Sequence, residues 1–368
     1  MSPAASASRA VIGTSCVPPE TRVVRLPTGR IVQTPLLVPS FSSKGFALSD
    51  ADRRRTEVSP LLDGLIDQLS RSFLVSAYDL HHRLLKAGDG LGDSDWSSNP
   101  LAKTELLFID SGGYEVTQGS DAGELVQDRR PTREWNGESY RSLLDSLPKA
   151  ADNVAAVAPD MPGESYGAQV RSAQEFLAAW PPLASVVLLK PPVPGAPHDF
   201  TKLVPDASRL GFFAVVGVTE KELGDTLLKR VIAIMELRDL LTRAGHRMPI
   251  HVFGALDPLY VPLYFAAGGD IFDGLTWLRY AYWHGLAVHV EHGPLLNKQT
   301  DLRDDVRRWT VAASNLTQLG QLRANLMRFA NEGGNWTIYD DTMVGRAGEM
   351  PSDVLSATYR AAVAERNT

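Results

Sequence analysis

A short acidic, glycine-rich motif closes an apolar run in the first third of the chain. Residues 106–109 read Leu-Leu-Phe-Ile, and residues 110–114 read Asp-Ser-Gly-Gly-Tyr. An apolar run closed by turn-forming residues is typical of a buried strand, which here would deliver the carboxylate of Asp110 to its carboxyl end. The paired glycines permit a sharp turn and a close approach of a ligand, with the ring of Tyr114 beside that space. Taken alone, the motif also fits a plain turn begun by Asp.

Other apolar runs end in residues that could join Asp110 in one site. These residues are Asp160, Lys190, Gly217, Gly254 and Asp273, with Phe253 directly before one of the glycines. If the runs are strands of one parallel barrel, their carboxyl ends meet at the mouth where barrel enzymes place their catalytic groups. Carboxylates accept hydrogen bonds from N–H groups, and the rings of Tyr114 and Phe253 can stack on a flat surface. The set predicts a site for a flat, polar ligand such as a purine-like base.

Apolar strands that alternate with helices must position these residues. Strands are predicted at 73–77, 106–109, 154–158, 185–189, 212–216, 250–253 and 271–272, with 286–290 as the last strand. Helices are predicted at 61–70, 79–87, 139–147, 169–180, 199–210, 223–244 and 259–267. Strands that are apolar throughout indicate a parallel sheet covered on both faces, and about eight strand–helix units are the size of a TIM (β/α)8 barrel. An open doubly wound sheet is the alternative, but no Gly-x-Gly-x-x-Gly turn follows an early strand.

The two ends of the chain fall outside this alternation. Residues 1–20 are rich in Ala, Ser and Pro and are predicted to be flexible. The runs 23–26 and 31–38, on either side of Pro-Thr-Gly, predict an N-terminal β-hairpin. The predicted organisation is a flexible N-terminus (1–20), an α/β barrel domain (21–300) and a helical C-terminal extension (301–368). The extension would hold helices at 302–316, 319–331 and 351–366, with a loop at 333–348.

Composition and charge limit the classes of function. The chain has 368 residues, a net charge of −6 and 44% hydrophobic residues, as in a soluble globular protein. Without a transmembrane run or a signal peptide, a cytoplasmic location away from membranes is expected. The single cysteine, Cys16, excludes an internal disulfide, and the histidines lack metal-ligand spacing, so no metal or cofactor is predicted. The acidic balance requires any nucleic-acid contact to come from a local patch, such as Arg53–Arg55 or residues 129–133.

Several segments together resemble the tRNA-guanine transglycosylase family. The Asp-Ser-Gly-Gly-Tyr-Glu-Val run at 110–116 is similar to that family's Asp-Ser-Gly-Gly-Phe-Gln-Val motif. The Gly-Asp-Ile-Phe-Asp run at 269–273 is similar to its Gly-Val-Asp-Met-Phe-Asp motif. Shorter similarities lie at 29–39, 76–80, 216–218 and 253–254. The resemblance runs through most of the barrel region and implies a TIM barrel.

The resemblance also implies roles for the residues at the strand ends. Asp273 would be the nucleophile that attacks the ribose C1′ of a target nucleotide and holds the sugar as a covalent ester. Asp110 would be the general base toward the incoming base. The contacts to the base would come from Asp160 at its Watson–Crick edge, the backbone at Gly217 and Gly254, and the rings of Tyr114 and Phe253. Arg279 would hold a phosphate or a neighbouring base.

The chain departs from the family pattern in the zinc region and beside two site residues. The cysteines of the family's structural zinc site are missing, so the helices after Asp301 would replace a subdomain that borders the family's dimer interface and nucleic-acid surface. Lys190 stands where the family has a glutamine. Such a cation could meet a substrate carbonyl or phosphate, or pair with an aspartate and keep it ionised. Gly274 replaces a cysteine after Asp273.

The resulting hypothesis is a pentosyltransferase that exchanges guanine for a 7-deazaguanine base in nucleic acid. Both tRNA and DNA are open as substrates, since one branch of the family acts on DNA and the altered surface is compatible with that branch. A homodimer or a protein partner is also open. The alternatives are a non-catalytic paralogue or partner subunit that binds the base, and an N-glycosidase of small nucleosides. The retained Asp110 and Asp273 favour catalysis.

Overall fold

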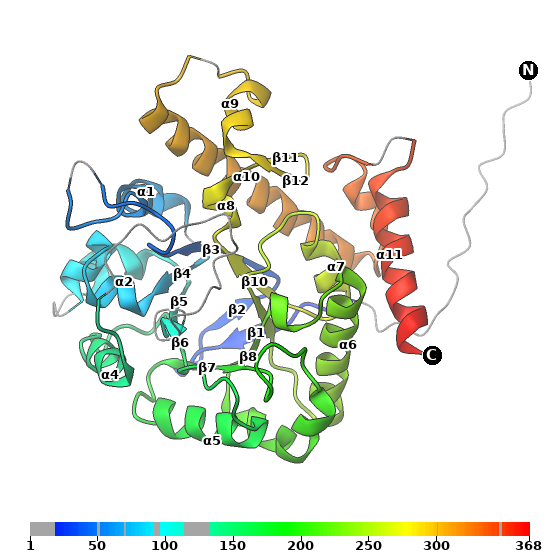
Figure 1. Cartoon of the computed structure of the whole chain (residues 1–368), viewed down its shortest axis with the longest axis horizontal. Coiled ribbons are helices and arrows are strands. Elements are labelled where there is room, and N and C mark those ends of the chain that lie inside the picture. The colour runs from blue at the N-terminus through cyan, green and yellow to red at the C-terminus, as the bar shows by residue number, and fades with distance from the viewer. Residues whose placement is uncertain are drawn as a thin grey trace, which may run out of the picture.

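Eight parallel strands form a closed barrel in the computed structural model, which describes residues 19–49, 52–69, 71–91, 96–113, 133–299, 301–345 and 348–368. The strands are β3 (Leu36–Phe41), β4 (Ser72–Ser76), β5 (Leu106–Asp110), β6 (Val154–Val157), β7 (Ala184–Leu189), β8 (Val215–Thr219), β9 (Ile250–Phe253) and β10 (Ile271–Gly274). Neighbours pair in chain order, and β10 closes the barrel on β3 with Asp273 beside Val38. The predicted α/β TIM barrel is therefore confirmed (Figure 1).

The main helices surround the strands (Figure 1). They are α1 (Val58–Leu65), α2 (Ala77–His81), α4 (Gly137–Asp145), α5 (Tyr166–Leu177), α6 (Leu227–Arg243), α7 (Val261–Ala266) and the 3-10 helix η5 (Phe200–Phe212). Polar side chains start several of them: Asn136 accepts from the Ser139 amide at the start of α4, and Thr226 accepts from the Lys229 amide at the start of α6. Shorter 3-10 helices are η1 (Ile66–Gln68), η2 (Lys86–Gly90), η3 (Trp96–Ser98), η4 (Pro100–Lys103), η6 (Glu220–Glu222), η7 (Val290–His292) and η8 (Trp336–Tyr339).

The run 31–38 was predicted as one hairpin strand, but it contributes to two different sheets. Its first part is β2 (Ile31–Gln33), which pairs with β1 (Val23–Arg25) in the predicted N-terminal hairpin. Its second part begins β3, the first strand of the barrel. Pro35 stands between the two parts and has no amide N–H to donate to a neighbouring strand, which separates them.

The prediction of 286–290 as the last barrel strand is wrong. β12 (Leu286–His289) pairs antiparallel with β11 (Tyr280–Trp283) in a separate two-stranded sheet. His284 and Gly285 connect them with φ angles of 44° and 79°. Two consecutive positive φ angles make the tight two-residue turn of a hairpin, so the chain returns on β11 instead of crossing to the barrel. The place of the eighth barrel strand belongs to β3.

The strand predicted at 212–216 lies three residues further along, as β8 (Val215–Thr219). Phe212 instead ends η5. The shift places Gly217 in the middle of the strand and not at its carboxyl end, contrary to the prediction. Thr219 is the residue that closes β8.

The N-terminal hairpin closes the amino-terminal end of the barrel. Its Val24, Leu26 and Val32 are buried in the same apolar cluster as residues of the strands, such as Phe108 and Ile271. Arg22 also pairs with Asp270, directly before β10, at 3.1 Å. The carboxyl-terminal mouth is the end where the strand-end residues of the predicted site gather.

The C-terminal region is helical, as predicted, and packs against the barrel. α10 (Asp304–Asn331) is one continuous helix where two were predicted, because neither Gly nor Pro interrupts residues 317–318. Figure 1 shows it passing beside α8 (Thr276–Arg279), α9 (Gly293–Leu296) and the β11–β12 ribbon. α11 (Pro351–Arg366) has the predicted bounds and lies on α6 and α7, where Tyr359 donates to the Ala266 carbonyl at 3.0 Å. No helix of the described ranges is long and apolar enough to span a membrane.

Candidate active site at the carboxyl-terminal mouth

Asp273 lies in β10 with its carboxylate held by three groups. Its Oδ2 accepts a hydrogen bond from the Ser40 hydroxyl at 2.7 Å. Its Oδ1 accepts from the Gly254 amide at 3.2 Å and lies 3.0 Å from Nε2 of His251. The residue is only 5% exposed. Gly254 has a φ of +81°, a conformation that glycine adopts at little cost. The structure thus fixes the orientation of the carboxylate predicted to be the nucleophile.

His251 is a site residue that the sequence-based prediction missed. It lies in β9 within the run Ile-His-Val-Phe, where a single histidine looks like part of the core. Side chains of a strand alternate between faces, so residues 251 and 253 point to the same side. That relation to Phe253, a predicted site residue, was the available signal. The two rings stack with their centroids 3.7 Å apart.

Asp110 ends β5, as predicted, and the glycines after it make the predicted turn. Its Oδ2 accepts from the Gly112 amide at 3.2 Å, and Gly112 has a φ of +75°. A Cβ atom at Gly112 would lie 2.7 Å from the indole nitrogen of Trp135. A Cβ atom at Gly113 would lie 2.7 Å from the carboxylate of Asp160. A side chain at either position would therefore displace a neighbour, and the second position brings the turn against another predicted site residue.

The environment of Asp110 changes its acidity strongly. The pKa of Asp110 is raised to about 7, chiefly by burial and also by the negative charges of Asp160 and Asp273, while the Gly112 amide and Lys190 act in the opposite direction. A carboxyl group with this pKa is present in both protonation states near neutral pH. Asp110 is consequently able to accept or to donate a proton under physiological conditions.

Lys190 joins two carboxylates directly after β7. Its Nζ lies 3.5 Å from Asp160 Oδ2 and 3.3 Å from Glu222 Oε2, and it donates to the Thr219 hydroxyl at 2.9 Å. Burial raises the pKa of Asp160, and the ammonium group of Lys190 opposes that rise. Of the roles considered for Lys190, the structure shows one, the ion pair between its ammonium group and the carboxylate of Asp160.

Gly217 and Phe253 meet inside the barrel. A Cβ atom at Gly217 would lie 2.5 Å from the ring of Phe253, so the ring covers the backbone of β8 at this point. Phe253 itself is 7% exposed and belongs to the apolar cluster inside the barrel. The two residues are brought together as expected, and their contact with a base stays a prediction.

Arg279, at the end of α8, is partly buried. Its guanidinium donates to the Lys44 carbonyl at 3.1 Å and lies over the ring of Phe46 at 5.8 Å from the centroid. No carboxylate of the described ranges forms an ion pair with it, and burial lowers its pKa. Tyr114 lies outside the described residues.

The basic runs considered as nucleic-acid patches are partly neutralised. Arg54 and Arg55 form ion pairs with Asp52, and Arg55 also pairs with Asp89. Arg133 donates to the His82 carbonyl at 2.8 Å, whereas residues 129–132 lie outside the described ranges.

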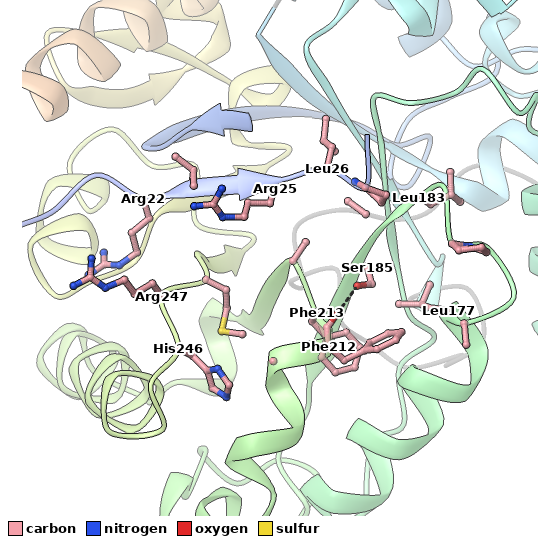
Figure 2. A pocket seen from close by; sticks show the side chains of 18 of the residues that line it. Arg22, Arg25, Leu26, Leu177, Leu183, Ser185, Phe212, Phe213, His246 and Arg247 are labelled. Atoms are coloured by element: carbon pink, nitrogen blue, oxygen red, sulfur yellow. Dashed lines mark hydrogen bonds between the residues drawn. The ribbon is translucent and has the colours of Figure 1, made fainter. Parts of the chain in front are cut away.

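A pocket of about 810 Å³ lies at the opposite end of the barrel (Figure 2). The hairpin residues Arg22 and Arg25 line one side together with His246 and Arg247, while Phe212 forms part of the apolar side. None of the predicted site residues lines this pocket. It is therefore separate from the carboxyl-terminal mouth.

Within the described ranges, no group of three or more His, Cys, Asp or Glu residues could hold a metal ion. Compared with family models and with curated proteins, the chain gives no match.

Proposed function

We propose that the protein is a base-exchanging transglycosylase that replaces guanine with a 7-deazaguanine base in tRNA or DNA. The observation that carries this proposal is the pairing of a rigidly held carboxylate, Asp273, with a second carboxyl group, Asp110, whose pKa is raised to about 7. The sequence resemblance supplies the class of base and of polymer. Asp160, beside Lys190, supplies an acceptor for the N–H groups of a guanine-like edge.

The hydrogen bonds to Asp273 favour one of its oxygens as the nucleophile. Oδ1 lies within hydrogen-bonding distance of two donors, the Gly254 amide and His251, whereas Oδ2 accepts from Ser40 alone among the described residues. Oδ2 therefore keeps more lone-pair density for attack on C1′. The bond from Oδ2 to C1′ forms as the bond from C1′ to the leaving base breaks, which gives a glycosyl ester.

Asp110 would move the protons of both half-reactions. In its protonated form it donates to the departing base, and in the resulting ionised form it takes the proton from the ring nitrogen of the incoming base. That nitrogen then attacks C1′, the ester bond breaks, and Asp273 leaves as a carboxylate. Asp110 is thus protonated at the end of the cycle, as it was at the start, and the cycle needs no oxidant, reductant or cofactor.

The test is incorporation of radiolabelled guanine into bulk tRNA, single-stranded DNA or double-stranded DNA. We expect label in one polymer with the wild-type chain, no label with Asp273→Asn, and unchanged labelling with Asp341→Asn, an exposed aspartate of the C-terminal region. Absence of label in every polymer would contradict the proposal. Base release from free nucleosides would then indicate an N-glycosidase, and tight binding of a 7-deazaguanine without reaction would indicate a non-catalytic paralogue.

A further inference from the structure

The buried ring of His251 has a single hydrogen-bond partner among the described residues. The side chain is fully buried, with Nε2 3.0 Å from Oδ1 of Asp273. The face of the ring stacks on Phe253, at an interplanar angle of 20°, and its centroid lies 5.0 Å from that of Phe108. Nδ1 is buried and has no hydrogen-bond partner within the described ranges.

This environment determines which nitrogen carries the proton. An ionised carboxylate can only accept hydrogen bonds, so Nε2 must donate if it is to lie 3.0 Å from Oδ1. Nδ1 has no hydrogen-bond partner within the described ranges, so a proton there would have no acceptor. His251 is thus a fixed N–H donor toward the carboxylate.

We propose that His251 is a positioning residue that makes Asp273 a good leaving group in the second half of the reaction. This inference rests on the proposed base exchange. In the glycosyl ester the charge of the carboxylate is gone, and Oδ1 is the carbonyl oxygen. When the incoming base breaks the ester, negative charge returns to the carboxylate, and donors at Oδ1 stabilise it without having to reorganise.

The same donor has the opposite effect on the first half-reaction. A hydrogen bond to the free carboxylate stabilises it and makes it a slightly weaker nucleophile. Removal of the donor should therefore slow breakdown of the ester more than its formation, so that the covalent intermediate accumulates. A residue with a merely structural role would depress both steps together.

The kinetic test compares His251→Phe with His251→Gln. Phenylalanine keeps the stacking on Phe253 but has no donor, whereas the glutamine amide can donate to Oδ1. For His251→Phe we expect breakdown of the intermediate to slow about tenfold to a hundredfold, the usual effect of a hydrogen bond to a charged group. More polymer should then be trapped on the protein in a denaturing gel, with recovery toward wild type in His251→Gln. His292→Phe, at an exposed histidine of η7, is the matched control.

A second measurement does not depend on activity. Proton–nitrogen correlation spectra of the wild-type chain with ¹⁵N-labelled histidine should assign His251 as the tautomer protonated at Nε2. A proton at Nδ1 would overturn the inference even if base exchange occurs. Equal slowing of ester formation and breakdown in His251→Phe would also overturn it. If the wild-type chain forms no intermediate but shows the expected tautomer, the proposed function fails while the assigned hydrogen bond stands.

Discussion

Asp110, Asp160 and Asp273 lie close together but have different partners. Asp273 is held by a hydroxyl, an amide and an imidazole, and Asp160 lies beside an ammonium group. Within the described ranges, Asp110 accepts a hydrogen bond only from the Gly112 amide, and the charges of the other two act on it. Different environments separate the acidities of neighbouring carboxyl groups, which lets one serve as nucleophile and another as proton carrier.

The pKa of Asp110 predicts the pH dependence of base exchange. Because the ionised form must accept the proton of the incoming base, the rate of the second half-reaction should rise with pH and then level off. The levelling should come below the free-protein value of about 7, because the ester removes the charge of Asp273 that helps to raise this pKa. Single-turnover rates between pH 5 and pH 9 measure this, and Asp110→Asn should lose the dependence together with most of the rate. A wild-type profile that is flat from pH 5 to pH 9 would refute the role.

The same raised pKa has a consequence for the free energy of unfolding. A carboxyl group with a raised folded-state pKa contributes stability that is complete below its unfolded pKa of 3.8 and is lost as pH rises through about 7. Ionised Asp110 then costs at most about 4 kcal/mol, a cost that Asp110→Asn avoids. Urea unfolding should give Asp110→Asn a higher free energy of unfolding than the wild type, by a difference that grows from pH 4 to pH 8. An equal gain at both pH values would argue against the shift.

The ammonium group of Lys190 affects the acidity of two aspartates of the site. Its charge lowers the pKa of Asp110 and Asp160, so Lys190→Gln should raise both. We expect the rising limb of the pH profile to move to higher pH, with a rate loss about threefold to tenfold larger at pH 6.5 than at pH 8.5. Lys202→Gln, at an exposed lysine of η5, should leave the profile in place. An unmoved limb in Lys190→Gln would contradict this coupling.

The turn after β5 packs Gly113 against Asp160, the carboxylate predicted to read the base. Gly113→Ala should push Asp160 away, because the new methyl group would lie 2.7 Å from its carboxylate. A misplacement of this size can lower the rate by up to about 100-fold. Gly137→Ala adds a methyl group at the start of α4, where nothing lies within 4 Å, and should leave exchange unchanged. Equal activities of the two variants would show that the turn does not position Asp160.

The alternation of apolar strands and helices was enough to predict the barrel, since both faces of a parallel sheet must be covered. The alternation is not sufficient at β3, where a proline separates two short runs, or at β12, where a turn at His284-Gly285 reverses the chain. The strand-end aspartates were predictable because turn residues follow them. The hydrogen bond from His251 was not, because it joins strands β9 and β10 and depends on which face each side chain points to.

At the scale of the whole molecule, α10 is attached to the barrel through α1. A Cβ atom at Gly64 would lie 1.8 Å from the ring of Trp309, so Gly64→Ala must displace this contact and should destabilise the fold by about 1–3 kcal/mol. Gly320→Ala, within α10 and with nothing within 4 Å, should instead stabilise it by up to about 1 kcal/mol. Urea unfolding of both variants measures the difference. If Gly64→Ala leaves the free energy of unfolding unchanged, the contact between α1 and Trp309 of α10 does not stabilise the fold.

The seam between β10 and β3, where the last barrel strand pairs with the first, can form only after the last strand has been synthesised. Ser40 and Asp273 hydrogen bond across this seam, although 233 positions separate them in the chain. Ser40 is therefore synthesised long before Asp273, whose carboxylate its hydroxyl orients. The first seven barrel strands cannot close into a barrel until the eighth has been synthesised. Because closure over such a long loop is slow, the unfinished barrel needs protection from aggregation during translation. A chain that stops before residue 271 lacks both a closed barrel and the proposed nucleophile Asp273, so incomplete products cannot carry out the proposed reaction on nucleic acid.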